Sequence, residues 1–338
     1  MRRSILYLSV LLLLGSILSC KDAFRGSTST GRPYEILVVS DDTLSTGNNP
    51  IDTLTNILRS HVPGLPQYES AFKVIYTTNS QYTSVLKSVH NIIMLKISDK
   101  YAQPRLSFMS DVYASPQRIL TVEAPDVASC TSYLWKNKQN IIDFFTEFEM
   151  NCRMDVLRQH HNITVSRKVT SLFGGDVFVP VDMRFIKTNR NFLWASNNSA
   201  SANQNFVIYT YSVAGKNINY IAKRDSVVNV NISGGKKGSY MVTDINSVAL
   251  SKRNIKGNDV TVLRGLWKMK GDFMGGPFVS YVYVDKSSST AYALEVFVFS
   301  PSEKKCDLIR GLEASLRTFT VPWNNKITGN HHNNIENK

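Results

Sequence analysis

The sequence of 338 residues is long enough for two domains of ordinary size, and its hydrophobic content of 43% is sufficient for a core in each. The formal net charge of +13 excludes a predominantly acidic surface and favours acidic partners. No run of like charge exceeds two residues, so lysines and arginines spread over solvated faces are the simpler alternative. Nucleic acid is not an expected partner, because the first twenty residues direct the chain out of the cytoplasm.

The N-terminal residues have the order of a secretory signal peptide. Arg2 and Arg3 precede an apolar stretch from Leu6 to Leu14, and small residues follow up to Cys20. This stretch is too short to cross a bilayer core of ~30 Å as a permanent helix. Residues 1–19 are therefore predicted to be a cleaved signal peptide.

The residues that end this segment, Ile17-Leu18-Ser19-Cys20, resemble the bacterial lipobox. The resemblance implies cleavage before Cys20, attachment of diacylglycerol to its sulfur and acylation of the new amine. More than one acyl chain gives a stable anchor. An ordinary secretory signal with an incidental cysteine is the alternative. The expected location is the cell envelope, at the outer membrane, with the body on its periplasmic face or at the cell surface.

Residues 20–33 are polar and are predicted to be a flexible tether. From residue 34, strand and helix patterns alternate. Asp126 is a good N-cap for one long helix with an apolar stripe from Val127 to Cys152. Residues 34–160 are therefore predicted to be an α/β domain, either ferredoxin-like or with a small mixed sheet. The expected strands are YEILVVS, FKVIYTT, NIIMLKIS and SPQRILTVEAP, and the expected shorter helices are Ile51 to Leu58 and SQYTSVLKSV.

Short strands dominate the second half, and most of them alternate apolar with polar residues as half-buried antiparallel strands do. A helix is expected around Tyr220 to Val228, and an amphipathic helix from about Glu303 to Phe319. Residues 168–320 are predicted to be an α+β domain with an antiparallel sheet. Its element order is loosely similar to the PsbP and Mog1 fold, a likeness that transfers no function. The tail, 321–338, is expected to be disordered. The expected strands are DVFVPVDMRFIKT, RNFLWAS, QNFVIYTYS, VTVLRGLWKMK, PFVSYVYVD and AYALEVFVFS.

Lipidation of Cys20 leaves three cysteines, Cys130, Cys152 and Cys306, so at least one stays unpaired within the chain. In a continuous helix Cys130 and Cys152 are about 33 Å apart, which is too far for a disulfide. Buried free thiols are therefore expected.

Signatures of catalysis and of bound cofactors are missing from the sequence. The glycines of GSTSTGRP have the spacing of a phosphate loop, but Arg32 and Pro33 replace the lysine and hydroxyl residues, and a strand follows instead of a helix. The histidine pairs His160-His161 and His331-His332 have no further ligand at the spacing of a tetrahedral metal site. The sequence predicts no cofactor, no metal and no catalytic residue.

Two groups of charged residues remain as candidate sites. Asp41 and Asp42 follow the first strand at its C-terminal end, where α/β folds place ligands, and a solvated turn or an N-cap is the alternative. Arg264, Lys268 and Lys270 alternate along RGLWKMK and predict a cationic face for an acidic partner, with solvated surface charge as the alternative. The glycines that follow in GDFMGGP indicate a hairpin turn, because no helix follows them to hold a phosphate.

Several long stretches resemble a family of Bacteroidota lipoproteins known as a domain of unknown function, DUF4837. They run from about Arg32 to Phe319. The resemblance implies a lipid-anchored envelope protein and carries no activity, ligand or catalytic residue. The stretches are GRPYEILVVSDDTL, VPGLPQYESAF, YIAKRDSVV, GSYMVTD and RGLWKMKGDFMGGPFVSY.

These observations predict a membrane-anchored envelope lipoprotein that acts as a non-catalytic binding or assembly module. Its expected partner, besides the membrane, is another envelope protein or an acidic glycan. Two alternatives stay open. One is an enzyme that acts on envelope polymers with a site between the two domains, and the other is a lipid- or lipoprotein-handling protein with a large apolar cavity.

Overall fold

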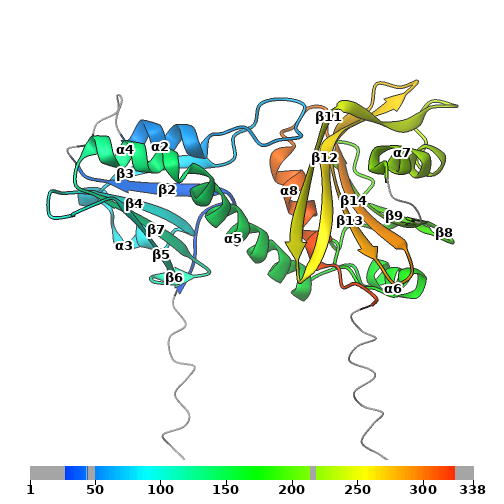
Figure 1. Ribbon diagram of the computed structural model, residues 1–338, viewed down its shortest axis with the longest axis horizontal. Coiled ribbons are helices and arrows are strands. Elements are labelled where there is room, and N and C mark those ends of the chain that lie inside the picture. The colour runs from blue at the N-terminus through cyan, green and yellow to red at the C-terminus, as the bar shows by residue number, and fades with distance from the viewer. Residues whose placement is uncertain (1–26, 43, 45–49, 214–217, 324–338) are drawn as a thin grey trace, which may run out of the picture. The chain divides into compact units, whose positions relative to one another are not determined.

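The computed structural model describes residues 27–42, 44, 50–213 and 218–323, which divide into two compact units (Figure 1). Unit 1 comprises the described residues up to Leu58 together with Phe72–Ile141. Unit 2 comprises Arg59–Ala71 and the described residues from Ile142 onwards, whereas the sequence placed the boundary near residue 160. The predicted signal peptide, Cys20 and the tail after residue 323 lie outside the described residues. Within them, no helix has the length and apolar character needed to span a membrane.

Unit 1 is built on a five-stranded mixed sheet, the second of the two folds expected for this half. The first four strands are parallel, and the edge strand is antiparallel to its neighbour. Parallel strands covered on both faces have continuous apolar sequences, which is why EILVV and NIIML were recognisable. Across the sheet the order is β3 (Lys73–Thr78), β2 (Glu35–Ser40), β4 (Asn91–Ile97), β7 (Arg118–Ala124) and β5 (Arg105–Ser110).

Helices lie on both faces of this sheet (Figure 1). The longer ones, α2 (Pro50–Leu58) and α4 (Val127–Lys136), pack together on one face. Two short helices, η1 (Asn79–Gln81) and α3 (Ser84–Lys87), replace the single helix expected over SQYTSVLKSV. The segment they form packs Tyr82 and Leu86 on the other face, against the buried residues Leu37, Val39, Ile92 and Ile119.

The long helix expected from Val127 to Cys152 is broken at Asn137. The helix α4 starts after the predicted cap Asp126, whose carboxylate accepts the N–H of Ser129, and α5 (Lys138–Gln159) follows after the break. Asn137 has φ −103° and ψ 13°, and its side-chain amide donates to the carbonyl oxygen of Tyr133. The backbone N–H of Asn137 also donates to this oxygen, and a side-chain bond to the preceding turn of this kind often bends a helix.

Unit 2 is built on a seven-stranded antiparallel sheet, as expected for an α+β domain. Residues 176–184, expected to be part of a strand, form a loop, and the helix α6 (Ile163–Phe173) was not expected. Across the sheet the order is β11 (Tyr240–Ile255), β12 (Asn258–Lys270), β13 (Gly275–Asp285), β14 (Thr290–Phe299), β10 (Asn203–Ser212), β9 (Phe192–Ser196) and β8 (Phe185–Asn189).

Two helices enclose the sheet of unit 2 (Figure 1). The helix α7 (Tyr220–Asn231) covers one face, over a core that includes Trp267 and Phe278. The helix α8 (Cys306–Thr318) covers the opposite face, where Tyr281 and Tyr283 donate hydrogen bonds to it. Side chains of β13 therefore alternate between the two helices, as the pleat of a strand requires.

Candidate functional site

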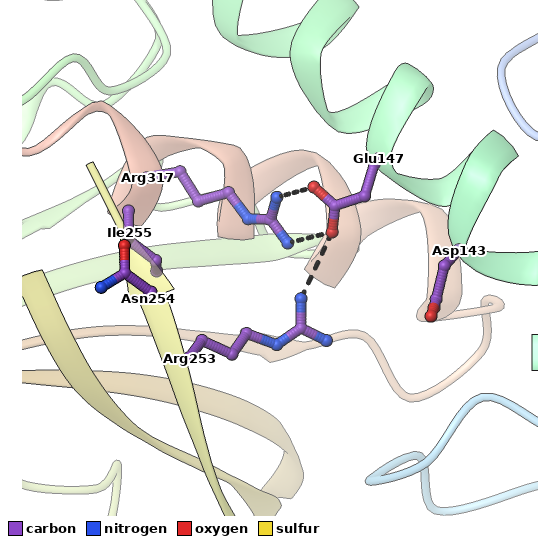
Figure 2. A pocket seen from close by; sticks show the side chains of 6 residues that line it. All are labelled: Asp143, Glu147, Arg253, Asn254, Ile255 and Arg317. Atoms are coloured by element: carbon purple, nitrogen blue, oxygen red, sulfur yellow. Dashed lines mark hydrogen bonds and ion pairs between the residues drawn. The ribbon is translucent and has the colours of Figure 1, made fainter. Parts of the chain in front are cut away.

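A polar pocket of about 340 Å³ lies in unit 2, between α5, the end of β11 and the last turn of α8 (Figure 2). These elements are distant in the sequence. Packing of Met150 and Met154 on α5 against Ala314 on α8 holds the two helices together beside the pocket. Six residues line it: Asp143, Glu147, Arg253, Asn254, Ile255 and Arg317.

Local structure places each of these side chains. Asp143 and Glu147 are four residues apart on α5, so they project from one face of the helix. Arg253 stands near the end of β11, before a tight turn in which Lys256 and Gly257 both have positive φ. Arg317 belongs to the last turn of α8. The pocket therefore depends on how one strand end meets two helices.

Two guanidinium groups converge on the carboxylate of Glu147 (Figure 2). Arg317 donates from Nη1 to Oε2 and from Nη2 to Oε1, the latter over 3.0 Å. Arg253 donates from Nη1 to the same Oε1 over 3.3 Å. The paired contact of Arg317 is the fork geometry in which arginine binds a carboxylate most firmly. The Arg317 side chain is only 11% exposed, whereas those of Glu147 and Arg253 are 46% and 45% exposed, so the Arg253 side of the cluster faces solvent.

These contacts keep Glu147 ionised. Hydrogen bonds from Arg317 hold the pKa of Glu147 below its usual range, and the charges of Arg317 and Arg253 add to that effect against the opposing effect of burial. Burial lowers the pKa of Arg317, but its hydrogen bonds to Glu147 and the acidic groups around it together outweigh burial and raise that pKa. An ionised carboxylate cannot donate a proton, so Glu147 is not suited to act as a general acid.

Two other guanidinium–carboxylate pairs in unit 2 fasten helices to the sheet. Arg224 on α7 bonds to Glu295 on β14. Arg264 on β12 donates from Nη2 to both carboxylate oxygens of Glu313 on α8, over 2.7 and 2.8 Å. Tyr281 also donates to Glu313, over 2.7 Å. Both carboxylates are buried, so neither is accessible to a ligand.

The described part of the chain has no set of His, Cys, Asp and Glu side chains arranged to hold a metal ion. Its cysteines, Cys130, Cys152 and Cys306, are free, and the first and last of them are buried. Burial raises the pKa of the Cys130 thiol to about 11, so that thiol stays protonated and unreactive at neutral pH.

The two predicted acidic residues belong to unit 1. Asp41 and Asp42 follow β2, as expected. The carboxylate of Asp42 accepts the hydroxyl of Ser80 and its backbone N–H, and these bonds, the hydroxyl first, lower the pKa of Asp42. Asp42 thus ties the end of β2 to η1. Asp42 therefore stabilises a turn, which is close to the alternative of a solvated turn or an N-cap.

The three predicted cations do not form one exposed stripe. Alternation along β12 points Arg264 towards the face covered by α8, where its guanidinium pairs with Glu313. Lys268 and Lys270 stay exposed: the ammonium of Lys268 lies 3.6 Å from Asp244, and that of Lys270 lies 5.7 Å from the ring centroid of Tyr240. The predicted cationic face is therefore reduced to these two lysines.

Sequence reasoning selected none of the pocket residues. The only local signal is the spacing of Asp143 and Glu147, which puts two carboxylates on one helix face. Arg253 and Arg317 have ordinary neighbours in the sequence, and only the fold brings them to Glu147.

Comparisons with known proteins match both halves of the chain to families of unknown function. Residues 162–318 match the model of a domain of unknown function, DUF4837, and residues 29–158 match that of another, DUF8532. The expected family is thus confirmed for the second half. The stretches GRPYEILVVSDDTL and VPGLPQYESAF, which were also assigned to it, fall instead on DUF8532. No curated protein matches the sequence.

Solved structures show only a distant likeness. The Ran-binding protein Mog1p of Saccharomyces cerevisiae is 10% identical, with a TM-score of 0.29, over 44% of this chain and 90% of Mog1p. A structure from Bacteroides thetaiotaomicron is 13% identical, with a TM-score of 0.24, over 44% of each chain. At these TM-scores the likeness supports no inference about binding.

Proposed function

We propose that this chain, whose residues 162–318 belong to the DUF4837 family, is a lipid-anchored envelope protein that binds an acidic glycan without catalysis. The exposed guanidinium of Arg253 is the observation that carries the proposal. It reaches the pocket from β11 and uses one donor on Glu147. A guanidinium has five N–H donors, so Arg253 retains donors suited to the carboxylate of a sugar acid.

The other polar groups of the pocket suit sugar hydroxyls. The amide of Asn254 both donates and accepts, and the carboxylates of Asp143 and Glu147 accept. A volume of about 340 Å³ is at the lower end for small-molecule pockets, so it favours a sugar unit over a protein segment. The formal net charge of +13 adds a general attraction for an acidic polymer.

The charge state of Glu147 favours binding over glycoside hydrolysis at this pocket. Glycoside hydrolysis needs one carboxyl that gives a proton to the leaving oxygen. Arg317 and Arg253 keep Glu147 ionised, which removes it from that role.

Titration calorimetry tests glycan binding with the mature protein in detergent. The ligands are an oligogalacturonate and the same oligosaccharide with its carboxyl groups reduced. We expect binding of the acidic form only. Arg253→Gln should weaken it by about 10- to 150-fold, because a hydrogen bond to a charged group contributes ~1.5–3 kcal/mol.

Lys252→Gln is the matched control, because it removes the same charge from the neighbouring position on β11 and leaves the pocket lining intact. Equal losses in the two variants would show that only overall charge matters. Arg253-dependent binding of a polyglutamate peptide, with no binding of the sugar acid, would replace the glycan by an acidic protein segment.

The membrane anchor is the second part of the proposal, and it rests on the signal-like N-terminus and on Ile17-Leu18-Ser19-Cys20. We expect the protein to incorporate an alkyne-labelled fatty acid in cells and to fractionate with the outer membrane. Cys20→Ser should abolish both. Membrane fractionation that survives Cys20→Ser would contradict the anchor and leave the glycan site untouched.

A further inference from the structure

We propose that unit 1 contacts the bilayer surface through an interfacial patch formed by Val85, Lys87, Val112 and Tyr113. This inference rests on the lipid anchor proposed at Cys20, and it adds a contact made by the folded protein itself. The occupant of the patch is the headgroup region of the membrane that holds the anchor.

The start of the described chain is fastened at this patch. The strand β1 (Ser27–Thr28) pairs in parallel with β6 (Ala114–Ser115). The hydroxyl of Ser27 donates to the carbonyl oxygen of Tyr113 over 3.1 Å. The N–H of Thr30 donates to the carbonyl oxygen of Ser88, just after α3, over 2.9 Å. The chain therefore leaves unit 1 directly beside Tyr113 and α3.

The distance to the lipid is short. Seven residue steps separate Ser27 from Cys20. Seven steps of chain can span at most about 25 Å. A lipid on Cys20 thus keeps the patch within reach of the headgroups, which is why a bilayer is the partner that fits it.

The side chains of the patch are those that favour a membrane interface. Val85 is 74% exposed, and Val112 and Tyr113 are each 43% exposed. The ammonium of Lys87 lies 5.8 Å from the ring centroid of Tyr82 and 5.6 Å from that of Tyr113. Tyrosine and lysine side chains each have an apolar body and a polar end. The body can lie among acyl chains while the polar end lies among headgroups.

The local charge also suits a membrane with anionic lipids. On the segments 79–91 and 105–118, Arg105 is paired with Glu123 and the carboxylate of Asp42 is bound to Ser80, so the cation that the patch itself presents is Lys87. One Asp111 oxygen accepts the backbone N–H of Gln117 over 2.7 Å, which holds that carboxylate in its turn. Each cation near an anionic surface adds attraction of about 1 kcal/mol.

Fluorescence quenching tests the contact in the full lipidated protein, reconstituted in vesicles of phosphatidylethanolamine and phosphatidylglycerol. The background variant is Cys152→Ser, which removes the partly exposed native thiol. An environment-sensitive label is attached at Val112→Cys or, as the matched control, at Val127→Cys. Val127 is 40% exposed and starts α4, on the opposite face of the sheet from α3 (Figure 1).

We expect the Val112 label to shift to the blue and to be quenched by lipids that carry a quencher near the headgroup, and the Val127 label to do neither. Flotation of the vesicles reports the anchor separately. If the protein floats but both labels behave alike, the membrane contact of the patch is contradicted and the lipid anchor is still supported. A blue shift at Val112 without lipid quenching would also overturn it, because the patch would then be covered by protein. Protein that does not float would overturn the anchor and the inference together.

Discussion

Arg224 and Glu295 form an ion pair that is enclosed between α7 and the sheet of unit 2. The Nη2 atom lies 2.7 Å from Oε1, and the two side chains are 1% and 0% exposed. Nε donates to the second carboxylate oxygen over 2.8 Å, and Nη1 donates to the hydroxyl of Thr243 over the same distance. The ring of Phe278 lies 4.0 Å from the guanidinium carbon. Removing both charges from water is costly, so the pair is tolerated because nearly every donor has a partner.

Arg224→Met should lower the free energy of unfolding by about 3–5 kcal/mol, because it leaves Glu295 charged, buried and without its counterion. The double variant Arg224→Met with Glu295→Leu should recover most of that loss, since it removes both charges. Urea denaturation followed by circular dichroism measures both. A double variant that is less stable than Arg224→Met would show that the pair is not coupled in this way.

Much of the fold follows from apolar patterning, and its exceptions have physical causes. The strands β10, β12, β13 and β14 are interior strands of the sheet of unit 2, and their sequences show the burial. The strands β5 and β11 are edge strands and are exposed over much of their length, so they lack an apolar pattern to recognise. Exposure of this kind is usual for edges, which proteins protect with polar and charged side chains.

The candidate site was not predictable in the same way. Glu147, Arg253 and Arg317 come from a helix, a strand end and a second helix. Nothing in the local sequence of any one of them indicates the others. Periodicity reports which face of an element is buried, but it carries no information about which elements meet. The break at Asn137 in the single helix expected there likewise leaves no mark in the apolar period.

Glu69 supplies a helix cap from a distant loop. Its carboxylate accepts the backbone N–H groups of Lys305 and Cys306, at 2.9 to 3.1 Å, at the start of α8, where Lys305 itself makes no side-chain cap. Glu69→Ala should lower the free energy of unfolding by about 1–2 kcal/mol, because it leaves buried donors unpaired. Glu303→Ala, which removes an exposed carboxylate just before the helix, is the control and should be nearly neutral. Equal stability of the two variants in urea would contradict the capping role.

Glu313 makes the stability of unit 2 sensitive to acid. Burial opposes ionisation, but the charge and hydrogen bonds of Arg264, together with Arg317 and Tyr281, outweigh it and lower the pKa of Glu313 from 4.5 to about 2. A carboxylate with a depressed folded pKa stabilises the fold above its unfolded pKa, and this contribution is lost as the pH falls through the folded pKa. Stability should therefore decrease between about pH 4.5 and 2, by on the order of 3 kcal/mol from this group.

Denaturation at a series of pH values measures this dependence. Glu313→Gln should be less stable than the wild type at pH 7, because Arg264 loses its counterion, and should lose less stability as the pH falls through that window. Glu303→Gln should keep the wild-type slope, since that residue is exposed. An unchanged slope in Glu313→Gln would assign the acid sensitivity to other carboxylates.

Gly276, in the glycine-rich stretch GDFMGGP, allows two strands to approach closely. A Cβ at this position would lie 2.0 Å from the carbonyl oxygen of Val298 on β14, the same oxygen that accepts the indole N–H of Trp267 over 3.2 Å. Gly276→Ala should therefore push β14 away and cost about 3 kcal/mol, because backbone atoms in a sheet have little room to move.

Gly235→Ala is the matched control for this substitution, because its Cβ would meet nothing nearer than an Asp272 oxygen at 3.6 Å. Its stability in urea should stay within ~0.5 kcal/mol of the wild type. If Gly276→Ala were as stable as this control, the close approach of β13 and β14 would be contradicted. A loss confined to Gly276→Ala would show that this glycine is needed for β13 to pack closely against β14 beside Trp267. The glycine-rich stretch GDFMGGP would then have a structural role that requires no bound ligand.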